Sequence, residues 1–313
     1  MLGVMTALSA GIDYIDLEFL GQTGIIASVI LHSRAGVAII DPGPSTTLPT
    51  LRAGLSEKGM APADVRAILL THIHLDHAGA TGTLLEECPD ATVFVHERGA
   101  PHLSDPSKLL VSASRLYGAD MDYLWGEVRA VPANRLRVLG ERDDLSIVGH
   151  ELESAWTPGH ASHHVSYFNR AASIAFVGDT AGICRPGGRI VLPPTPPPDI
   201  DLEAWQASTD RILGWNADVL FLTHFGPQRS PRGHLQDLWV RMDDWSRRVR
   251  ASLDTPGTDE ARAAAFVDEV TADLVRSVGR VEAQGYARAG RFDFSWSGLA
   301  RYWRKKGTGL AGV

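Results

Sequence analysis

The chain has 313 residues, 44% of them hydrophobic and 21% charged, which is typical of a globular protein with a large core. Its net charge of -7 argues against broad electrostatic binding to nucleic acid, and no apolar window approaches the roughly 20 residues of a membrane helix. Two cysteines, Cys88 and Cys184, are too few for a disulfide framework and are interpreted as ordinary thiols. Because residues 1–12 lack the pattern of a secretory leader, we expect a cytoplasmic protein. From the net charge and the hydropathy we expect neither nucleic-acid nor membrane partners.

Three runs rich in β-branched residues open the chain, at residues 14–20, 25–31 and 37–40. Glycine-containing turns separate them, which predicts consecutive antiparallel strands, with residues 1–12 as a ragged start to the first. The third run ends at Asp41, followed by a Pro-Gly pair. Asp41 is predicted either to cap this turn or to orient a metal-bound histidine from behind.

Leucines at helical spacing predict a helix over residues 46–58, ended by Gly59. The apolar run at residues 65–70 predicts a buried strand. The strand ends abruptly in a polar loop that reads Thr71-His72-Ile73-His74-Leu75-Asp76-His77.

The donors of this loop suit a borderline divalent metal such as zinc, since they offer neutral nitrogens and an anionic oxygen. In an extended segment alternate side chains share a face, so His72 and His74 can bind one ion. Asp76 and His77, past the turn, can reach another. A loop of solvated histidines is the alternative, but four donors at this spacing favour metal binding. Residues 78–88 are predicted to form the following helix.

Residues 98–128, after a predicted strand at 91–95, form a long excursion rich in leucine and aromatic residues and broken by proline and glycine. It is predicted to be a cap-like insertion that forms an apolar pocket, or equally a surface helix that packs on the core. Short strands are predicted to follow at residues 136–139, 145–148 and 151–155.

Three later strand runs each end by presenting one potential ligand, namely His160, Asp179 and His224. The proline-rich stretch 192–198 is too stiff for a central strand and is predicted to be a connector or rim loop. Residues 230–313 carry amphipathic helical patterns, which predict a helical appendage that covers the site or mediates oligomerisation. Its basic aromatic end, residues 291–306, could bind an anion, although a snorkelling surface helix is the favoured interpretation.

The strand-end donors follow in the order His72, His74, Asp76, His77, His160, Asp179 and His224, with Asp41 upstream. In this order the sequence closely resembles the metallo-β-lactamase-fold superfamily of metallohydrolases over residues 14–228. The resemblance implies an α/β (α+β) fold, a four-layer αββα sandwich with a C-terminal helical appendage. The expected domains are a catalytic domain at residues 1–229 and a helical region at 230–313.

The family pattern also implies the roles of the donors. One metal ion would be held by His72, His74 and His160. A second would be held by Asp76, His77 and His224, with Asp179 bridging the two. Zinc is the first choice, with iron or manganese as alternatives. His163 and His164 are expected in outer or substrate-side roles.

Chemistry follows from this arrangement, because two divalent ions that share a water lower its pKa and polarise a substrate oxygen. Asp76 is the expected catalytic residue, since it can bind metal and orient the hydroxide. Within the superfamily the chain is similar to the glyoxalase II (hydroxyacylglutathione hydrolase) branch. This implies hydrolysis of a small-molecule thioester or lactone without a covalent enzyme intermediate.

Three other functions stay open at this point. The same core could serve a phosphodiesterase or nuclease, a mononuclear iron dioxygenase acting on a thiol persulfide, or a non-enzymatic binding protein. Hydrolysis of β-lactams is not expected, since those enzymes depart from the Asp76 pattern. Assembly into a homo-oligomer is left open.

Overall fold

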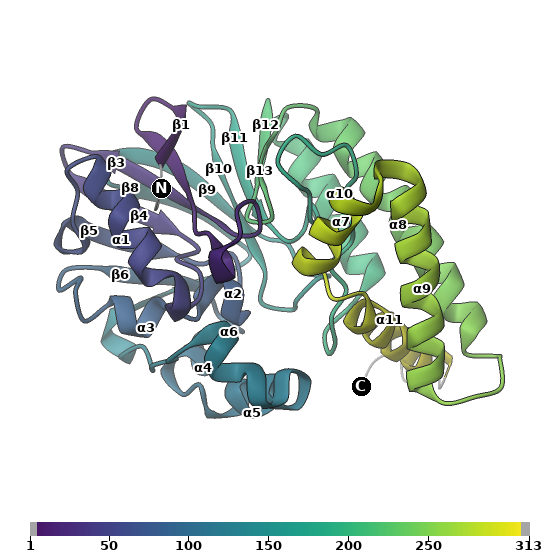
Figure 1. Ribbon diagram of the computed structural model, residues 1–313. Coiled ribbons are helices and arrows are strands. Elements are labelled where there is room, and N and C mark those ends of the chain that lie inside the picture. The colour runs from purple at the N-terminus through teal and green to yellow at the C-terminus, as the bar shows by residue number, and fades with distance from the viewer. Residues whose placement is uncertain (1–4, 308–313) are drawn as a thin grey trace.

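Two β-sheets packed face to face form the centre of the molecule, and the computed structural model describes residues 5–307 (Figure 1). The first sheet contains, in spatial order, β1 (Met5–Ser9), β2 (Ile12–Asp16), β3 (Ala27–Ser33), β4 (Gly36–Ile40), β5 (Val65–Leu69), β6 (Thr92–His96) and β7 (Leu136–Leu139). The second contains β13 (Gly226–Gln228), β12 (Val219–Leu222), β11 (Ile174–Gly178), β10 (Val165–Asn169), β9 (His150–Trp156) and β8 (Arg142–Ile147). Strands β4 to β7 run parallel, as do β11 and β12.

Alternating side chains of the strands separate an inner core from an outer one. In β4, Ala38 and Ile40 point between the sheets, where they join Phe176 and other residues of the second sheet. Val37 and Ile39 point the opposite way and pack in the cluster that holds the buried leucines of α1. Because successive strand side chains face opposite sides, one apolar strand supplies both cores.

Helices cover the outer faces of both sheets and extend beyond the sandwich. They are α1 (Leu48–Glu57), α2 (Leu75–Ala78), α3 (Thr81–Leu84), α4 (Ala100–Ser104), α5 (Ser107–Tyr117), α6 (Met121–Trp125), α7 (Leu202–Gly214), α8 (Pro231–Ser252), α9 (Asp259–Val278), α10 (Arg280–Ala289) and α11 (Phe292–Gly307). Helices α1 and α3 pack on the first sheet, while Ile212 of α7 and Leu235 of α8 pack on the second. The predicted four-layer αββα sandwich is therefore confirmed.

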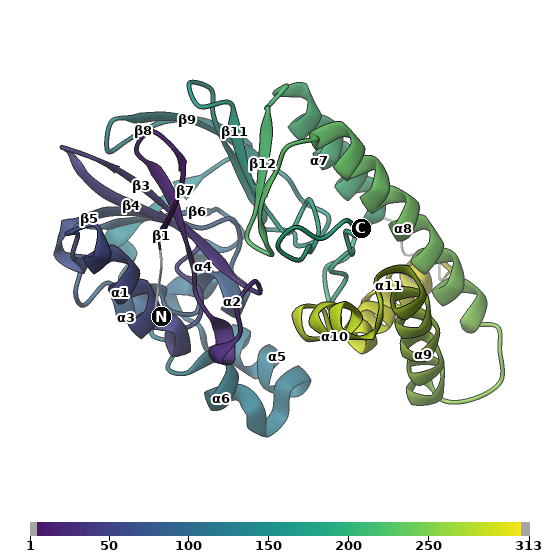
Figure 2. The ribbon, with the colours of Figure 1, turned by 45° about the horizontal axis from the view of Figure 1, so that its top comes forward.

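The C-terminal helices extend beyond the sandwich on one side (Figure 2). Trp245 of α8 contacts Phe266 of α9 and Phe292 of α11, with ring centroids 5.4 and 5.7 Å apart. The same cluster includes Trp205 of α7, so these helices also pack against the sandwich. The predicted C-terminal helical region is confirmed, while a domain boundary at residue 229 stays a prediction. None of the helices within residues 5–307 is long and apolar enough to cross a membrane.

The N-terminal strands differ from the prediction. Residues 5–9 form a separate strand, β1, rather than a ragged start to the next one. The predicted strand at 14–20 instead ends at Asp16 as β2, and a short 3-10 helix, Phe19–Gly21, follows. Glu18 and Leu20 have φ values of 48° and 53°, a left-handed conformation that a strand does not accommodate.

The prediction of one helix over residues 78–88 was also wrong. The chain instead forms two short helices, α2 and α3, that cover only part of this range. Long-range backbone bonds explain the break. The Ala80 amide donates to the Gly43 carbonyl at 2.8 Å, and the Gly43 amide donates to the His77 carbonyl at 3.0 Å. These two hydrogen bonds join the histidine loop to the turn after β4, so the backbone groups involved do not extend one continuous helix.

Both cysteines should be unreactive in the folded protein. Cys88 and Cys184 are buried, and burial raises the pKa of each thiol to about 12. Since the thiolate is the reactive form, we expect no thiols titrated by Ellman's reagent at pH 8 in native protein. Two should be titrated after denaturation. A thiol that reacts in the folded protein as fast as free cysteine would contradict the interpretation as inert residues.

Candidate metal centre

The predicted donors all follow the carboxyl ends of strands. His72 and His74 lie just after β5, His160 after β9, Asp179 after β11 and His224 after β12. Because β5 runs in the parallel part of its sheet and β9, β11 and β12 share one direction in theirs, each sheet brings its strand ends to one edge. The two edges meet, so donors far apart in the sequence lie together.

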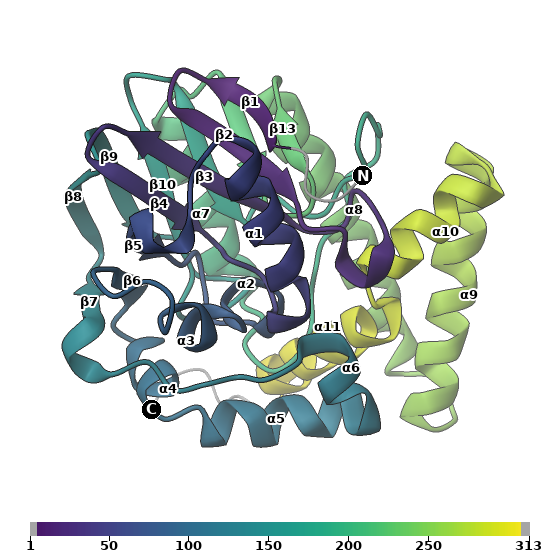
Figure 3. The ribbon, with the colours of Figure 1, turned by 60° about the vertical axis from the view of Figure 1, so that its left-hand side comes forward.

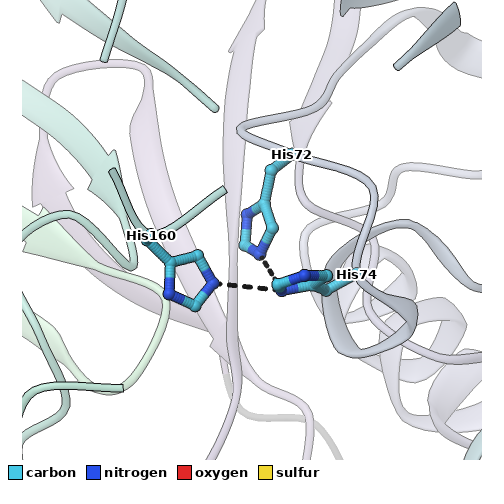
Figure 4. A group of neighbouring side chains, drawn as sticks. All are labelled: His72, His74 and His160. Atoms are coloured by element: carbon cyan, nitrogen blue, oxygen red, sulfur yellow. Dashed lines mark hydrogen bonds between the residues drawn. The ribbon is translucent and has the colours of Figure 1, made fainter. Parts of the chain in front are cut away.

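The first group of donors contains His72, His74 and His160, whose rings point toward one another from separate segments (Figure 4). His74 Nδ1 lies 2.9 Å from His72 Nε2 and 3.0 Å from His160 Nε2. Each of the three side chains therefore directs one ring nitrogen into the same small volume, and these nitrogens lie within 4.8 Å of one another.

The second group contains Asp76, His77 and His224. His77 Nε2 and His224 Nε2 are 3.2 Å apart, and Asp76 Oδ2 lies 3.3 Å from His224 Nε2. Asp76 and His77 belong to the short helix α2, which turns both side chains toward the end of β12. The structure thus brings together two nitrogens and one carboxylate beside the first group.

Asp179 lies between the two groups. Its Oδ2 is 3.3 Å from His160 Nε2, and its Oδ1 is 3.1 Å from His77 Nε2 and 3.5 Å from His224 Nε2. Oδ1 is buried and has no hydrogen-bond donor within residues 5–307. A buried carboxylate oxygen without a donor is costly, which favours a cation at this position.

The outward ring nitrogens of the histidines are held by acceptors that fix their tautomers. His160 Nδ1 donates to the Pro194 carbonyl at 2.8 Å, and His224 Nδ1 donates to the Ile25 carbonyl at 2.7 Å. His77 Nδ1 likewise donates to Asp41. In the neutral form, each Nε2 is then an unprotonated acceptor that points inward. The facing lone pairs of the neutral His77 and His224 rings repel, and a proton or a metal ion between them would remove this repulsion.

Asp41 occupies the position predicted for it, behind the histidines. Its Oδ1 accepts the Thr71 amide at 2.8 Å, and its Oδ2 accepts His77 Nδ1 at 2.8 Å. Oδ2 also accepts the hydroxyls of Thr71 and Thr223, at 2.7 and 2.9 Å. One buried carboxylate therefore joins the loop after β5 to the end of β12.

The electrostatics of the two groups differ. Burial opposes a positive charge on His77, but Asp179, Asp41 and Asp76 outweigh it and hold its pKa well above the ordinary value. By contrast, burial and then His160 lower the pKa of His74 to about 4. Three carboxylates thus favour a cation around His77, while neutral imidazoles present lone pairs around His74. Both properties fit a divalent metal ion.

His163 and His164 lie outside both donor groups. His164 is buried behind Asp179, whose backbone amide donates to His164 Nε2 at 3.2 Å, and its Nδ1 is 2.9 Å from Thr157 Oγ1. His163 lines the pocket in front of the donors. These positions agree with an outer role for His164 and a substrate-side role for His163, which stay predictions.

A cavity of about 470 Å³ opens in front of the donors. Its walls come from the 98–128 insertion, the proline-rich loop 192–198 and the C-terminal helices. Helices α5 and α6 lie beside α11 (Figure 3), and the rings of Tyr117 and Phe294 are 5.5 Å apart. The insertion and the proline-rich loop therefore both line the pocket, while the role of the insertion as a cap stays a prediction.

Local sequence patterns do not reveal the backbone acceptors of the site. The Ile25 and Pro194 carbonyls that orient His224 and His160 carry no side-chain signal. Phe19 and Leu20, which line the pocket, were assigned to a strand. A glycine-bounded loop before residue 25 was the available hint.

A sandwich with histidine and aspartate donors gathered at one edge defines a metal-binding α/β protein. Residues 21–224 match the model of the Metallo-beta-lactamase superfamily, and the chain belongs to this family. A metallo-beta-lactamase family protein from Thermus thermophilus shares the fold, with a TM-score of 0.70 and 24% identity. That alignment covers 96% of this chain and 95% of the other.

Curated relatives match over shorter segments. A metallo-beta-lactamase fold-containing protein from Sulfurisphaera tokodaii is 30% identical over 51% of this chain and 60% of its own length. A hydroxyacylglutathione hydrolase from Xylella fastidiosa is 32% identical over 45% of this chain and 40% of its own length. The chain thus spans about half the length of the curated relatives it matches.

Proposed function

We propose that this protein is a dinuclear metal-dependent hydrolase of a small carbonyl ester, a thioester or a lactone. The observation that carries the proposal is the pair of donor groups with the Asp179 carboxylate between them, at the floor of a pocket. The similarity to a hydroxyacylglutathione hydrolase, an enzyme named for a thioester substrate, supports the choice of bond.

In this proposal His72, His74 and His160 would hold one ion. Asp76, His77 and His224 would hold the other, Asp179 would be shared between them, and zinc is the first choice. Such ions polarise a carbonyl oxygen and lower the pKa of bound water. This set of nitrogen and oxygen ligands also suits iron and manganese.

The chain's own residues position the reactants. Asp76 has a side chain 28% exposed and lines the pocket, so it can accept a hydrogen bond from the attacking water and aim its lone pair at the carbonyl carbon. Pocket walls from the insertion and the C-terminal helices would surround the substrate on several sides. Both thiols are buried, which agrees with attack by water rather than by a cysteine.

Metal analysis with a substrate panel tests this proposal. We expect two metal ions per chain and hydrolysis of thioesters or lactones, lost by about 100-fold or more after chelation and restored by zinc. The panel also contains bis(p-nitrophenyl) phosphate and a thiol persulfide with an oxygen electrode.

Other outcomes would identify the alternatives. A single iron per chain with oxygen consumption would support a persulfide dioxygenase. Phosphodiester cleavage faster than thioester cleavage would support a nuclease-type hydrolase. Metal-loaded protein that is inert on every ester class would support a binding function, and each of these results would contradict the proposal.

A further inference from the structure

The pocket has an apolar side near the Asp76 group of donors. Tyr117 packs between Trp125 and Phe294, with ring centroids 5.0 and 5.5 Å away. Burial, followed by the nearby Asp76 carboxylate, raises the pKa of the Tyr117 phenol. Trp125 in turn stacks on Phe19 at 5.7 Å. This aromatic wall can enclose an apolar acyl group beside Asp76.

A different side of the pocket carries basic groups. Arg98 lies just before α4, His102 on α4 and Lys108 on the first turn of α5, and all three line the pocket. Gly99, the neighbour of Arg98, lies near His163, since a Cβ added to Gly99 would be in ordinary contact with the His163 Cβ at 3.5 Å. Arg98 and Lys108 are exposed residues of the pocket wall, and Arg98 lies on the side of His163.

Of the two other arginines that line the pocket, one is paired with a carboxylate and the other bonds a neutral amide. Arg291 is paired with Asp293 at 2.8 Å, and Arg288 is bonded to Gln22. Within residues 5–307 neither Arg98 nor Lys108 has a carboxylate within 4.0 Å, although Arg98 lies over the Trp156 ring at 4.6 Å.

The pocket also contains a carboxylate outside the donor groups, Asp199, which accepts the Ser162 hydroxyl at 2.7 Å. It forms no ion pair with the basic side chains. In a chain of net charge -7, Arg98 and Lys108 form no ion pair within residues 5–307, so these cations are available to attract an anion into the pocket.

We propose that the substrate is a thioester whose leaving group carries carboxylate or phosphate, bound by Arg98, His102 and Lys108, while its acyl group lies against Tyr117, Trp125 and Phe294. This proposal rests on the proposed hydrolase function. It selects a thioester over a lactone, because a thioester has separate acyl and thiol parts for the two sides of the pocket. Water forms the new bond to the acyl carbon, the carbon–sulfur bond breaks, and the thiol leaves with one proton of the water.

Three thioesters of one acyl group test the proposal: a neutral N-acetylcysteamine ester, a glutathione ester with carboxylates and a coenzyme A ester with phosphates. Arg98→Ala and Lys108→Ala should each raise KM for the anionic esters by about three- to tenfold, with little change in kcat. KM for the neutral ester should not change. Arg115→Ala is the matched control, because Arg115 lies on α5 but does not line the pocket.

Comparing KM for the glutathione ester and the coenzyme A ester shows whether the site binds carboxylate or phosphate, since only the coenzyme A ester carries phosphate. Added salt should raise KM for the preferred anionic ester and leave the neutral one unchanged. Equal KM changes for neutral and anionic esters, or an equal effect of Arg115→Ala, would overturn the proposal.

A binding measurement separates this inference from the hydrolase proposal. S-methyl glutathione and S-methyl coenzyme A, whose sulfur is blocked, would be titrated into metal-loaded protein by calorimetry. Weaker binding to the Arg98→Ala and Lys108→Ala variants supports the anion site even if no thioester is hydrolysed. Identical binding by wild type and variants overturns it even if the neutral thioester is a good substrate.

Discussion

Asp179→Ala should lower kcat by about 10³-fold or more and reduce the metal content from two ions per chain to about one. The physical reason is the position of this carboxylate. Its two oxygens face different donor groups, with Oδ2 near His160 and Oδ1 near His77. Without it, the proposed second ion loses a negative charge, and the attacking water loses the site that the two ions define.

Metal content, kcat and thermal unfolding would be measured on the same preparation. Asp199→Ala is the matched control, since it removes a carboxylate that lines the same pocket and bonds Ser162 but, within residues 5–307, belongs to neither donor group. We expect the control to keep two ions and to stay within a few-fold of wild-type kcat. An inactive Asp179→Ala protein that keeps its fold and both ions would contradict the bridging role.

The sequence predicted the donors because each one ends an apolar run. A strand such as β11 is recognisable from Ile174 to Val177, and the polar residue that follows it is conspicuous. Donor order and spacing then indicated the family and with it the sandwich. Strand β10 was missed because it starts at Val165, directly after two histidines that masked its apolar character.

Other features depend on contacts that no local pattern encodes. The ring contact between Tyr117 and Phe294 joins segments 177 residues apart in the sequence (294 − 117). The break between α2 and α3 depends on backbone bonds to Gly43, and the ring orientations depend on carbonyls such as Pro194. These are long-range interactions, so periodicity could predict helices and strands but not how they close the pocket.

The insertion and the C-terminal helices together explain how a shared fold can acquire its own substrate. The donors lie at strand ends, where the rigid sheets fix them. Much of the pocket wall instead comes from elements outside the two sheets, namely α5, α6 and α11. The chemistry and the specificity therefore reside in different parts of the chain.

Asp41→Asn should lower metal affinity by about 10- to 100-fold and the free energy of unfolding by about 2–4 kcal/mol. Asp41 accepts four hydrogen bonds, from the Thr71 amide and hydroxyl, His77 Nδ1 and the Thr223 hydroxyl. An asparagine of the same shape would place an NH₂ group against at least one of these donors. The buried donor would lose its partner, and His77 would lose the carboxylate that orients it.

The two effects can be measured separately. Urea denaturation of metal-free protein reports the stability, and chelator competition reports the affinity. Asp13→Asn is the matched control, since Asp13 is also buried and bonds a histidine, His32, at 2.8 Å, yet lies outside the donor groups. The control should lose stability but keep wild-type metal affinity. If both variants lost stability and neither lost affinity, Asp41 would serve only as the turn cap that its Pro-Gly context also allows.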